Sequence, residues 1–489
     1  MMAVPTVAVV GGGVVGCAVA YHLSRAAGRD AMRILVLDPQ APTIASAASS
    51  RSAGCVIGAS DAPEKVRLTA QTVTDVGALE RLLRTDLGYR RSGCLRLATD
   101  AADLARLARQ AEVTTKAVGG GLGATVVGRE AAERRAPWLR CPELRVAGAL
   151  WTEGDGVLDP TVLAGAYLRA ARALGTVELR PVAAARFEVE GERVVGVVPS
   201  EGSAIACDYA VNAAGAWAGL LAAGLGELPG LPMAPTRSHY WLSQSTPSQF
   251  DGSDPIVIMP GARAYTRPEG MHGCLLGLQE EVSLSWDAHG LPSPAAHPSL
   301  CADLVSGSAE QAQDALLNQL EELCEFFPAA AEIGWGHYTA GLSTYTVDGE
   351  YLIGGLPGIS GLSVATGCNG SMLSASGGVG RMVAAQVMQD LGLCGGGGGA
   401  VAAAAVGAAD AAGAAGGGQA PGGTLPAAGA DCSTVLTALG AQRYAPARFL
   451  EQGADGRRRW DVECGGGDVF SEEFRAQCAA RRGAKFRSS

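Results

Sequence analysis

The chain has 489 residues, enough for roughly two to three domains and for a core that needs no disulfide or metal ion to fold. Its 38 lysines and arginines against 48 aspartates and glutamates give a net charge of −10, which argues against a general nucleic-acid-binding protein. Hydrophobic residues make up 48% of the chain, so disorder along its whole length is excluded.

The 13 cysteines are scattered, with no CxxC pair and no cysteine–histidine cluster at zinc spacing. We therefore expect a reduced protein with incidental thiols and no metal site. The apolar start, MMAVPTVAVV, has no basic region, and no run of about 20 apolar residues follows it. These features predict no signal peptide and no membrane span, and they favour the cytoplasm without excluding an organelle.

The N-terminal segment has the pattern of a strand–helix–strand unit. Thr6–Val10 is a short apolar run typical of a buried parallel strand, and a glycine-rich turn follows it. Val14–Ala27 has the apolar spacing of a helix, and Arg33–Leu37 is a second buried strand that ends at Asp38. Together they predict a βαβ unit over residues 6–38.

Helices and strands are predicted to alternate along most of the remaining chain. Further helices are expected over 62–86, 309–327 and 376–391, with strands at 209–213, within 351–366, and as antiparallel strands within 255–279. From residue 395 to 430, 28 of 36 residues are glycine or alanine, which cannot build a specific core. This predicts a flexible insert over about 393–430, a docked segment at 431–450 and a loosely ordered remainder.

The glycines of the first turn match a dinucleotide-binding fingerprint. Gly11 allows the tight turn, Gly13 lets a pyrophosphate approach the backbone, and Gly16 lets the helix pack on the strand. The helix N-terminus offers free N–H groups to the phosphates, and Asp38 can accept the ribose hydroxyls. NAD and FAD both use this arrangement, so the turn alone does not choose between them.

Motifs further along carry a family resemblance. They are VAVVGGGVVGCAVAYHL at 7–23, SSRSAG at 49–54, EGDGVLDP at 153–160, VNAAGAWA at 211–218, TVDGEYLIGG at 346–355 and GLSVATGCNGSMLSASGGVGR at 361–381. In this order and spacing the chain resembles the D-amino-acid oxidase superfamily of FAD-dependent oxidoreductases, in its glycine oxidase, sarcosine oxidase and dimethylglycine dehydrogenase branch. The segment RYAPARF at 443–449 is similar to the family's terminal segment, displaced by the insert.

The resemblance implies an α/β fold with a GR2-type Rossmann FAD-binding domain and a second, antiparallel-sheet substrate domain. The FAD-binding domain would be discontinuous, over 1–85, 150–222 and 336–392. The substrate domain would take 86–149 and 223–335, and 431–489 would be the C-terminal segment.

The resemblance also assigns cofactor contacts by position. Beside the fingerprint glycines and Asp38, the residues expected to touch FAD are Val14, Val15, Ser49, Ser50, Val182, Ala213, Ala214, Gly215, Trp217, Gly370, Ser371, Met372 and Leu373. The run at 370–373 would place N–H groups and a helix N-terminus beside the flavin N1–C2=O edge. Simpler interpretations stay open: a serine N-cap pair, a tryptophan that only packs, and a glycine–serine connector.

Several family positions hold unusual residues here. Arg51 and Gly341 stand where relatives attach FAD through histidine or cysteine, so FAD is expected to be non-covalent. Ser343 and Ser374 replace the arginine and lysine that hold a substrate carboxylate in glycine oxidase and sarcosine oxidase. Leu275 replaces the lysine that activates oxygen.

Two groups of residues are candidates for the missing roles. In ARAYTR, Arg263, Tyr265 and Arg267 alternate and would share one strand face, where an arginine could bind a carboxylate. In TRSHYW, Arg237, His239 and Tyr240 form a second cluster, in which His239 could accept a proton. A solvated strand face and a structural histidine are the simpler alternatives.

The function implied is oxidation of a C–N bond in an amine or amino acid, with hydride transfer to flavin N5 and hydrolysis of the imine. With no lysine in a flavin-facing motif, a dehydrogenase with an electron-carrier partner is favoured over an oxidase. A flavin-bearing assembly or scaffold factor for a respiratory complex is the alternative, and an NAD-dependent dehydrogenase is a further one. The expected partner is otherwise a small amine or amino acid, with no nucleic acid.

Overall fold

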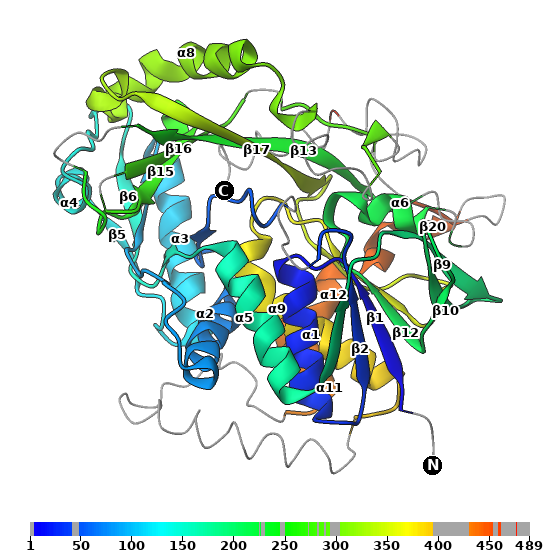
Figure 1. Ribbon diagram of the computed structural model, residues 1–489. Helices are drawn as coiled ribbons and strands as arrows, with labels where there is room; N and C mark the ends of the chain where they lie inside the picture. The colour runs from blue at the N-terminus through cyan, green and yellow to red at the C-terminus, as the bar shows by residue number, and fades with distance from the viewer. Residues whose placement is uncertain are drawn as a thin grey trace.

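A computed structural model describes residues 4–41, 48–223, 225, 230–244, 250–271, 273–280, 283–287, 290–293, 304–394, 430–452, 458–460 and 476. Two large sheets organise this part of the chain (Figure 1). The mixed α/β architecture predicted from the sequence is confirmed. The predicted insert at 393–430 lies almost wholly outside the described residues, as does most of 451–489.

The first sheet has six strands in the order β18-β19-β12-β1-β2-β8. Their bounds are β1 (Thr6–Val10), β2 (Arg33–Leu37), β8 (Thr176–Arg180), β12 (Tyr209–Asn212), β18 (Leu352–Gly355) and β19 (Leu362–Thr366). All neighbours pair in parallel except β18, which is antiparallel to β19. The predicted βαβ unit is confirmed, because β1 and β2 pair in parallel from Thr6↔Arg33 to Val10↔Leu37.

Helices cover one face of this sheet and a small sheet covers the other. The helices are α1 (Val14–Ala27), α2 (Pro63–Leu83), α5 (Pro160–Leu174) and α9 (Met372–Asp390), and they share a core with the sheet (Figure 1). The small sheet has the order β11-β10-β9, with β9 (Ala184–Glu190), β10 (Arg193–Pro199) and β11 (Ile205–Ala206), and it packs there with α6 (Ala218–Ala222). The short η1 (Gly215–Trp217) precedes α6 and packs against β17 (Trp335–Thr346). Both faces are therefore buried, as the apolar strand sequences predict.

The glycine–serine run before residue 376 is helical, which corrects the predicted start of this helix. The helix α9 begins at Met372, four residues before the expected Ser376. Met372, Leu373 and Ala375 of this early turn are buried in the core of the helical layer, so tertiary packing accounts for it. Further along α9, a Cβ at Gly380 would lie 2.7 Å from the backbone of Ala18, and one at Gly378 would collide with Leu68. Glycine weakens an isolated helix but here allows α9 to approach α1 and α2 closely.

The second sheet has eight strands in the order β17-β13-β16-β15-β14-β4-β6-β5. Their bounds are β4 (Cys94–Ala98), β5 (Ala124–Val127), β6 (Gly148–Thr152), β13 (Met233–Ser243), β14 (Ile256–Met259), β15 (Ala264–Glu269), β16 (Gly273–Leu278) and β17 (Trp335–Thr346). Neighbours are antiparallel except β14 and β4, so the antiparallel strands predicted within 255–279 are confirmed. The strand β17 belongs to this sheet, although the third segment of the predicted FAD-binding domain begins at residue 336; the domain division itself stays a proposal.

Helices also lie on both sides of the eight-stranded sheet. On the outer face, α4 (Arg129–Arg135) and α8 (Ala309–Phe326), with η2 (Pro260–Ala262) and η4 (Pro328–Ala331), share a core with the strands (Figure 1). On the inner face, α3 (Ala101–Val118) packs against the β4-β6-β5 end. A short pair, β3 (Cys55–Val56) and β7 (Gly156–Val157), lies apart from both sheets.

The segment after the insert folds back onto the helical layer. It contains α11 (Cys432–Leu439), α12 (Ala441–Tyr444), η5 (Pro446–Phe449) and the pair β20 (Leu450–Gln452) and β21 (Arg458–Trp460). Val435, Leu439 and Tyr444 are buried in the same core as α1 and α9. Arg443 pairs with Glu350 and Arg448 pairs with Asp348, so two ion pairs join this segment to the loop before β18.

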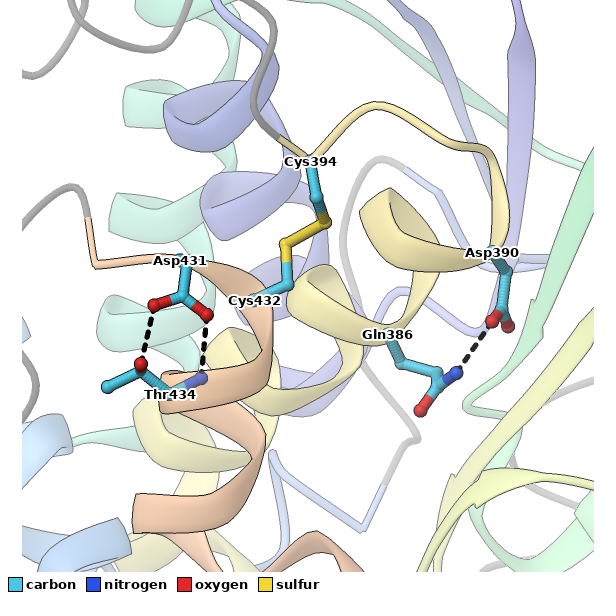
Figure 2. Close-up of a disulfide and its surroundings, with 6 residues drawn as sticks. All are labelled: Gln386, Asp390, Cys394, Asp431, Cys432 and Thr434. Atoms are coloured by element: carbon cyan, nitrogen blue, oxygen red, sulfur yellow. Dashed lines mark hydrogen bonds between the residues drawn. A yellow bond between two sulfur atoms is a disulfide. The ribbon is translucent and has the colours of Figure 1, made fainter.

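A disulfide joins Cys394, just after α9, to Cys432 at the start of α11 (Figure 2). The expectation that all cysteines are incidental free thiols is therefore wrong for this pair. Their separation of 38 residues spans the insert, so no short spacing motif signals the bond. Only the docking of α11 beside α9 brings the two sulfur atoms together.

Candidate functional site

A cavity of about 380 Å³ lies between the two sheets, within the range typical of small-molecule sites. Its wall contains the first turn of α1, the loop before β3, the end of β12, the first turn of α9 and the inner face of the eight-stranded sheet. The fold thus brings segments from residue 10 to residue 373 around one space.

The turn from β1 into α1 forms one end of the cavity. Gly11 has φ +106°, and a Cβ there would collide with the carbonyl of Ala213. A Cβ at Gly16 would collide with the carbonyl of Gly11, so Gly16 allows the helix to sit against the strand. Gly13 differs, because its only neighbour within 4 Å of an added Cβ is Ser49 Oγ, at 3.2 Å. It therefore leaves open space, as a pyrophosphate would need.

Asp38 follows β2 at the same end and is 9% exposed. Its Oδ2 accepts the Gly12 N–H at 2.7 Å, and its Oδ1 accepts the Gln40 N–H at 2.9 Å. These bonds fix the carboxylate at the cavity wall, where each oxygen keeps lone-pair capacity for a ribose hydroxyl.

The predicted serine pair divides into two roles. Ser49 lines the cavity, and its Oγ accepts the Val14 N–H at 3.0 Å. It thus satisfies an N–H of the first turn of α1 from another segment, which is compatible with a ligand contact; the N-cap residue of α1 is Gly13, so Ser49 is not the N-cap of this helix. Ser50 does not line the cavity, so its predicted contact has no support in the geometry.

The first turn of α9 forms a second electropositive end. Its N-cap residue, Ser371, makes no side-chain cap, and the first turn holds no acidic residue. The Ser371 hydroxyl lies 2.9 Å from Tyr351 Oη, which fixes this turn against the loop before β18. Gly370 has φ +66°, so it permits the tight entry into the helix. Free N–H groups of α9 are therefore directed at the cavity.

Most of the predicted cofactor contacts come together. Of 17 such residues, 15 line the cavity: Gly11, Gly13, Val14, Val15, Asp38, Ser49, Val182, Ala213, Ala214, Gly215, Trp217, Gly370, Ser371, Met372 and Leu373. Gly16 packs behind the wall, and Ser50 lies outside it. Trp217 also donates from Nε1 to the Pro292 carbonyl at 2.9 Å, so it both packs and lines the space.

Arg51 and Gly341, the two positions at which relatives attach FAD, are neighbours in space. A Cβ at Gly341 would lie 2.9 Å from Arg51 Cβ, and Arg51 donates to the Ala340 carbonyl at 3.0 Å. Both residues line the cavity. Neither side chain can form the histidine or cysteine bond to a flavin, so the wall here offers only contacts.

The serines at the two family carboxylate positions already have protein partners. Ser343 accepts a hydrogen bond from Ser238 Oγ at 3.0 Å. Ser374 Oγ accepts the Ile57 N–H at 3.0 Å and donates to the Cys55 carbonyl at 3.3 Å, which ties α9 to the β3 segment. These hydroxyls thus help to build the wall and carry no charge for an anionic substrate.

The structure separates the predicted ARAYTR group. Arg263 has φ +48°, precedes β15 and pairs with Glu322 of α8, so it does not share the strand face. Arg267 donates to the carbonyls of Ala53 and Pro268 and pairs with Glu269.

Neither arginine lines the cavity, which differs from the predicted role in substrate binding. The strand begins only after Arg263, so its alternation does not extend to that residue. Tyr265 does line the cavity.

The TRSHYW group is divided in the same way. Arg237 pairs with Glu280, away from the cavity. His239 and Tyr240 line it, but strand alternation directs their side chains to opposite faces. His239 Nδ1 lies 3.1 Å from Tyr338 Oη, and its ring packs against Trp241. A role for His239 in proton transfer stays a prediction.

Sequence reasoning missed an arginine on β4. Arg96 lines the cavity from the strand CLRLA, where it alternates with Leu95 and Leu97 of the outer core. The alternation of a charged residue between apolar ones on a buried strand was the available signal. Its place at the cavity depends on the pairing of β4 with β14, which is distant in the sequence.

Two further titratable groups belong to this end of the site. Cys55 lines the cavity, but burial raises the pKa of its thiol to about 11, so it is protonated at neutral pH and is a poor nucleophile. Asp155, behind the wall, is 1% exposed, and burial raises the pKa of its carboxyl to about 7. The Gly58 N–H donates to Asp155 Oδ1 at 2.8 Å and partly offsets that burial.

Metal binding has no structural support within the described ranges, where no group of three or more histidine, cysteine, aspartate or glutamate side chains is placed to hold an ion. In the same residues, none of the helices has both the length and the apolar character needed to cross a bilayer.

The chain is similar in sequence to known FAD-dependent oxidoreductases. A sequence model described as "DAO: FAD dependent oxidoreductase" matches residues 6–386. The chain is 27% identical over 382 residues to 4-methylaminobutanoate oxidase (formaldehyde-forming) of Paenarthrobacter nicotinovorans, covering 78% of this chain and 43% of that protein. It is 26% identical over 382 residues to glycine oxidase of Geobacillus kaustophilus (strain HTA426), covering 75% and 89%.

Mitochondrial dimethylglycine dehydrogenase of Mus musculus is 24% identical over 389 residues, covering 78% of this chain and 42% of that protein. The chain therefore spans less than half the length of this relative and of the methylaminobutanoate oxidase. Among solved structures, L-proline dehydrogenase from P. horikoshii has a TM-score of 0.65 at 21% identity, covering 79% of this chain and 93% of that one. This structural similarity shows that the two proteins share a fold.

Proposed function

The chain belongs to the DAO family of FAD-dependent oxidoreductases, and from that premise we propose that it oxidises a C–N bond of an amine or amino acid with non-covalently held FAD. The observation that supports this most directly is the cavity that joins the α1 turn, the α9 turn and the inner face of the eight-stranded sheet. One end suits a dinucleotide, and the other is closed by side chains that suit a small organic molecule.

The residues present fit FAD at both electropositive ends. The N–H groups at the start of α1, with the open space at Gly13, would hold the pyrophosphate, and Asp38 would hold the ribose. The first turn of α9 would stabilise negative charge that develops on the ring. FAD supplies the hydride-accepting chemistry when bound.

The contribution of the protein is orientation, exclusion of water and placement of charge. The sheet covers the cavity with Tyr240, Tyr265 and Ile258, which can pack on a bound amine and keep water away. No side-chain base is required if the amine arrives neutral, so the tyrosines need only hold it. Burial raises the pKa of Tyr240, which therefore stays protonated and can donate a hydrogen bond at neutral pH.

Electron transfer to a carrier is proposed in preference to oxygen. Leu275, at the position of the oxygen-activating lysine, is fully buried and uncharged. Of the lysines that the structure describes, Lys65 pairs with Glu350 and Lys116 with Glu112, and neither lines the cavity. Arg267, which pairs with Leu275 across the strands, is engaged by Glu269. The position of the oxygen-activating lysine therefore offers no cation to stabilise superoxide, because Leu275 is apolar and the neighbouring Arg267 is already paired.

The test is anaerobic mixing of the purified yellow protein with a panel of secondary and tertiary amines and amino acids. Bleaching of the flavin absorbance by at least one compound, followed by slow reoxidation in air and fast reoxidation by a dye, is the expected result. A flavin that no panel member bleaches would refute amine oxidation. Reoxidation within milliseconds in air-saturated buffer would refute the dehydrogenase assignment alone.

A further inference from the structure

One row of residues crosses the inner face of the eight-stranded sheet. The pairing registers are Arg96↔Ile258, Ile258↔Tyr265, Tyr265↔Gly277 and Gly277↔Tyr240, so five strands contribute one position each. All of these residues except Gly277 line the cavity. The Tyr265 ring lies over Gly277, where a Cβ would collide with it. The row therefore presents a cation, an aliphatic side chain and two tyrosines in sequence.

Arg96 is the cation in the cavity wall whose donors the protein leaves unused. Within the described residues, the wall holds two arginines and no lysine. Arg51 donates to the Ala340 carbonyl, whereas the guanidinium of Arg96 makes neither a hydrogen bond nor an ion pair there. Its donors are therefore available to a molecule in the cavity.

The surroundings of Arg96 favour a bound anion. Its neighbours in register are Leu150 on β6 and Ile258 on β14, both apolar and buried. Burial lowers the pKa of Arg96, which reports the cost of holding its charge there. The acids that act on it electrostatically, Asp155 and Asp61, are not in ion-pair contact with it. Arg96 is only partly exposed, and a cation withdrawn from water without a hydrogen-bonded partner costs free energy that an anionic ligand would recover.

We infer that Arg96 holds the anionic group of the substrate and that the substrate is an amine carrying a carboxylate. This inference rests on the proposed amine oxidation. The planar guanidinium matches a carboxylate with two parallel hydrogen bonds. From that anchor, Ile258 and Tyr265 offer apolar contact to the carbon chain.

The inference also explains the serines at the family carboxylate positions. Ser343 and Ser374 are bound to other parts of the wall and carry no charge. The anion site has moved to the β4 edge of the row, which sets the direction in which a substrate lies along the sheet. Arg96 is thus a specificity residue that contacts the substrate, and Tyr265 positions the chain beside it.

The experiment titrates the oxidised, FAD-loaded protein with unbranched carboxylates from acetate to hexanoate and follows the flavin visible spectrum. The primary amides of the same acids are the uncharged probes. We expect the carboxylates to bind and to perturb the spectrum, and the amides to bind much more weakly. A hydrogen bond to a charged group contributes about 1.5–3 kcal/mol, so Arg96→Gln should weaken carboxylate binding by about 10- to 100-fold. Arg96→Lys should recover part of that loss.

The matched control is Arg263→Gln, which removes an arginine in the turn before β15 that lies outside the cavity and pairs with Glu322. It should leave carboxylate binding unchanged. Equal affinity of the wild type for carboxylate and amide, absence of carboxylate binding, or unchanged affinity in Arg96→Gln would each overturn the inference. The comparison of carboxylate and amide uses the wild type alone, so it can overturn the inference even if a variant fails to retain FAD.

These experiments distinguish failure of the anion site from failure of the proposed amine oxidation. If carboxylates bind through Arg96 but no amine bleaches the flavin, the anion site stands and amine oxidation is refuted. If amines bleach the flavin but Arg96→Gln changes neither carboxylate binding nor the KM of acidic amines relative to neutral ones, amine oxidation stands and the anion site is refuted.

Discussion

The disulfide between Cys394 and Cys432 should hold the C-terminal segment onto the helical layer (Figure 2). It links the residues that follow α9 to the start of α11, whose Val435 and Leu439 are buried. Without the bond, docking of α11 must close the intervening chain by itself. Cys432→Ser removes the bond and keeps a side chain of similar size.

The magnitude follows from the length of chain that the bond closes. For a separation of 38 residues, the loop-entropy relation gives a stabilisation of about 3.9 kcal/mol at 25 °C, an upper value for a bond without strain. Complete burial of one leucine or valine contributes about 1.5–3 kcal/mol. The bond should therefore contribute roughly as much to docking as the burial of Val435 and Leu439 together.

Hydrogen exchange of the α11 amides is the direct assay, because it reports local opening as well as global unfolding. Exchange at 433–439 should become about 10²- to 10³-fold faster in Cys432→Ser, since every 1.4 kcal/mol changes an equilibrium tenfold. Wild type treated with a reductant should behave in the same way. Cys324→Ser, which removes a free cysteine of α8, is the control and should leave α11 protection unchanged.

Equal protection of α11 in the wild type and in Cys432→Ser would refute the reasoning, because docking would then be decided by packing and ion pairs alone. Faster exchange in the variant combined with no response of the wild type to reductant, once loss of the bond is verified by mass, would also refute it. That result would assign the effect to the altered side chain and not to the bond.

Gly13→Val should give folded but colourless protein, since its Cβ meets only Ser49 Oγ while its branches enter the proposed pyrophosphate space; a yellow variant with normal FAD content would contradict this. Asp155→Asn should stabilise the protein relative to the wild type, and increasingly so as pH rises from about 4 to 7. Over this range the Asp155 carboxyl is ionised in the unfolded chain, whereas its pKa of about 7 keeps it mostly protonated in the folded protein. The difference in the free energy of unfolding between variant and wild type should approach about 4 kcal/mol. Urea unfolding of both proteins across this pH range measures it, and parallel stability curves would oppose it. Gly277→Ala should displace the Tyr265 ring and lower kcat/KM by about 10- to 100-fold at unchanged FAD content; unaltered turnover would show that Tyr265 does not position the substrate.

The parts of this protein that its sequence could predict are those whose causes are local. The β1–α1–β2 unit depends on short apolar runs, helical spacing and a glycine turn, all within residues 6–38. The cofactor end could be predicted for the same reason, and Gly11, Gly13 and Asp38 lie together at the cavity. Family motifs added positions as distant as Gly370, because each motif is itself a short segment with a fixed local shape.

What the tertiary structure decided depends on pairings between distant segments. Arg96 reaches the cavity only because β4 pairs with β14, and Tyr265 and Tyr240 join its row through further strand pairings. Arg267, a reasonable anchor by sequence, is instead bound by Ala53 and Glu269. The glycines of α9 allow the neighbouring helices to approach closely, and Cys394 meets Cys432 because α11 docks there. Local patterns specify elements, whereas the free energy of packing them together decides which side chains meet.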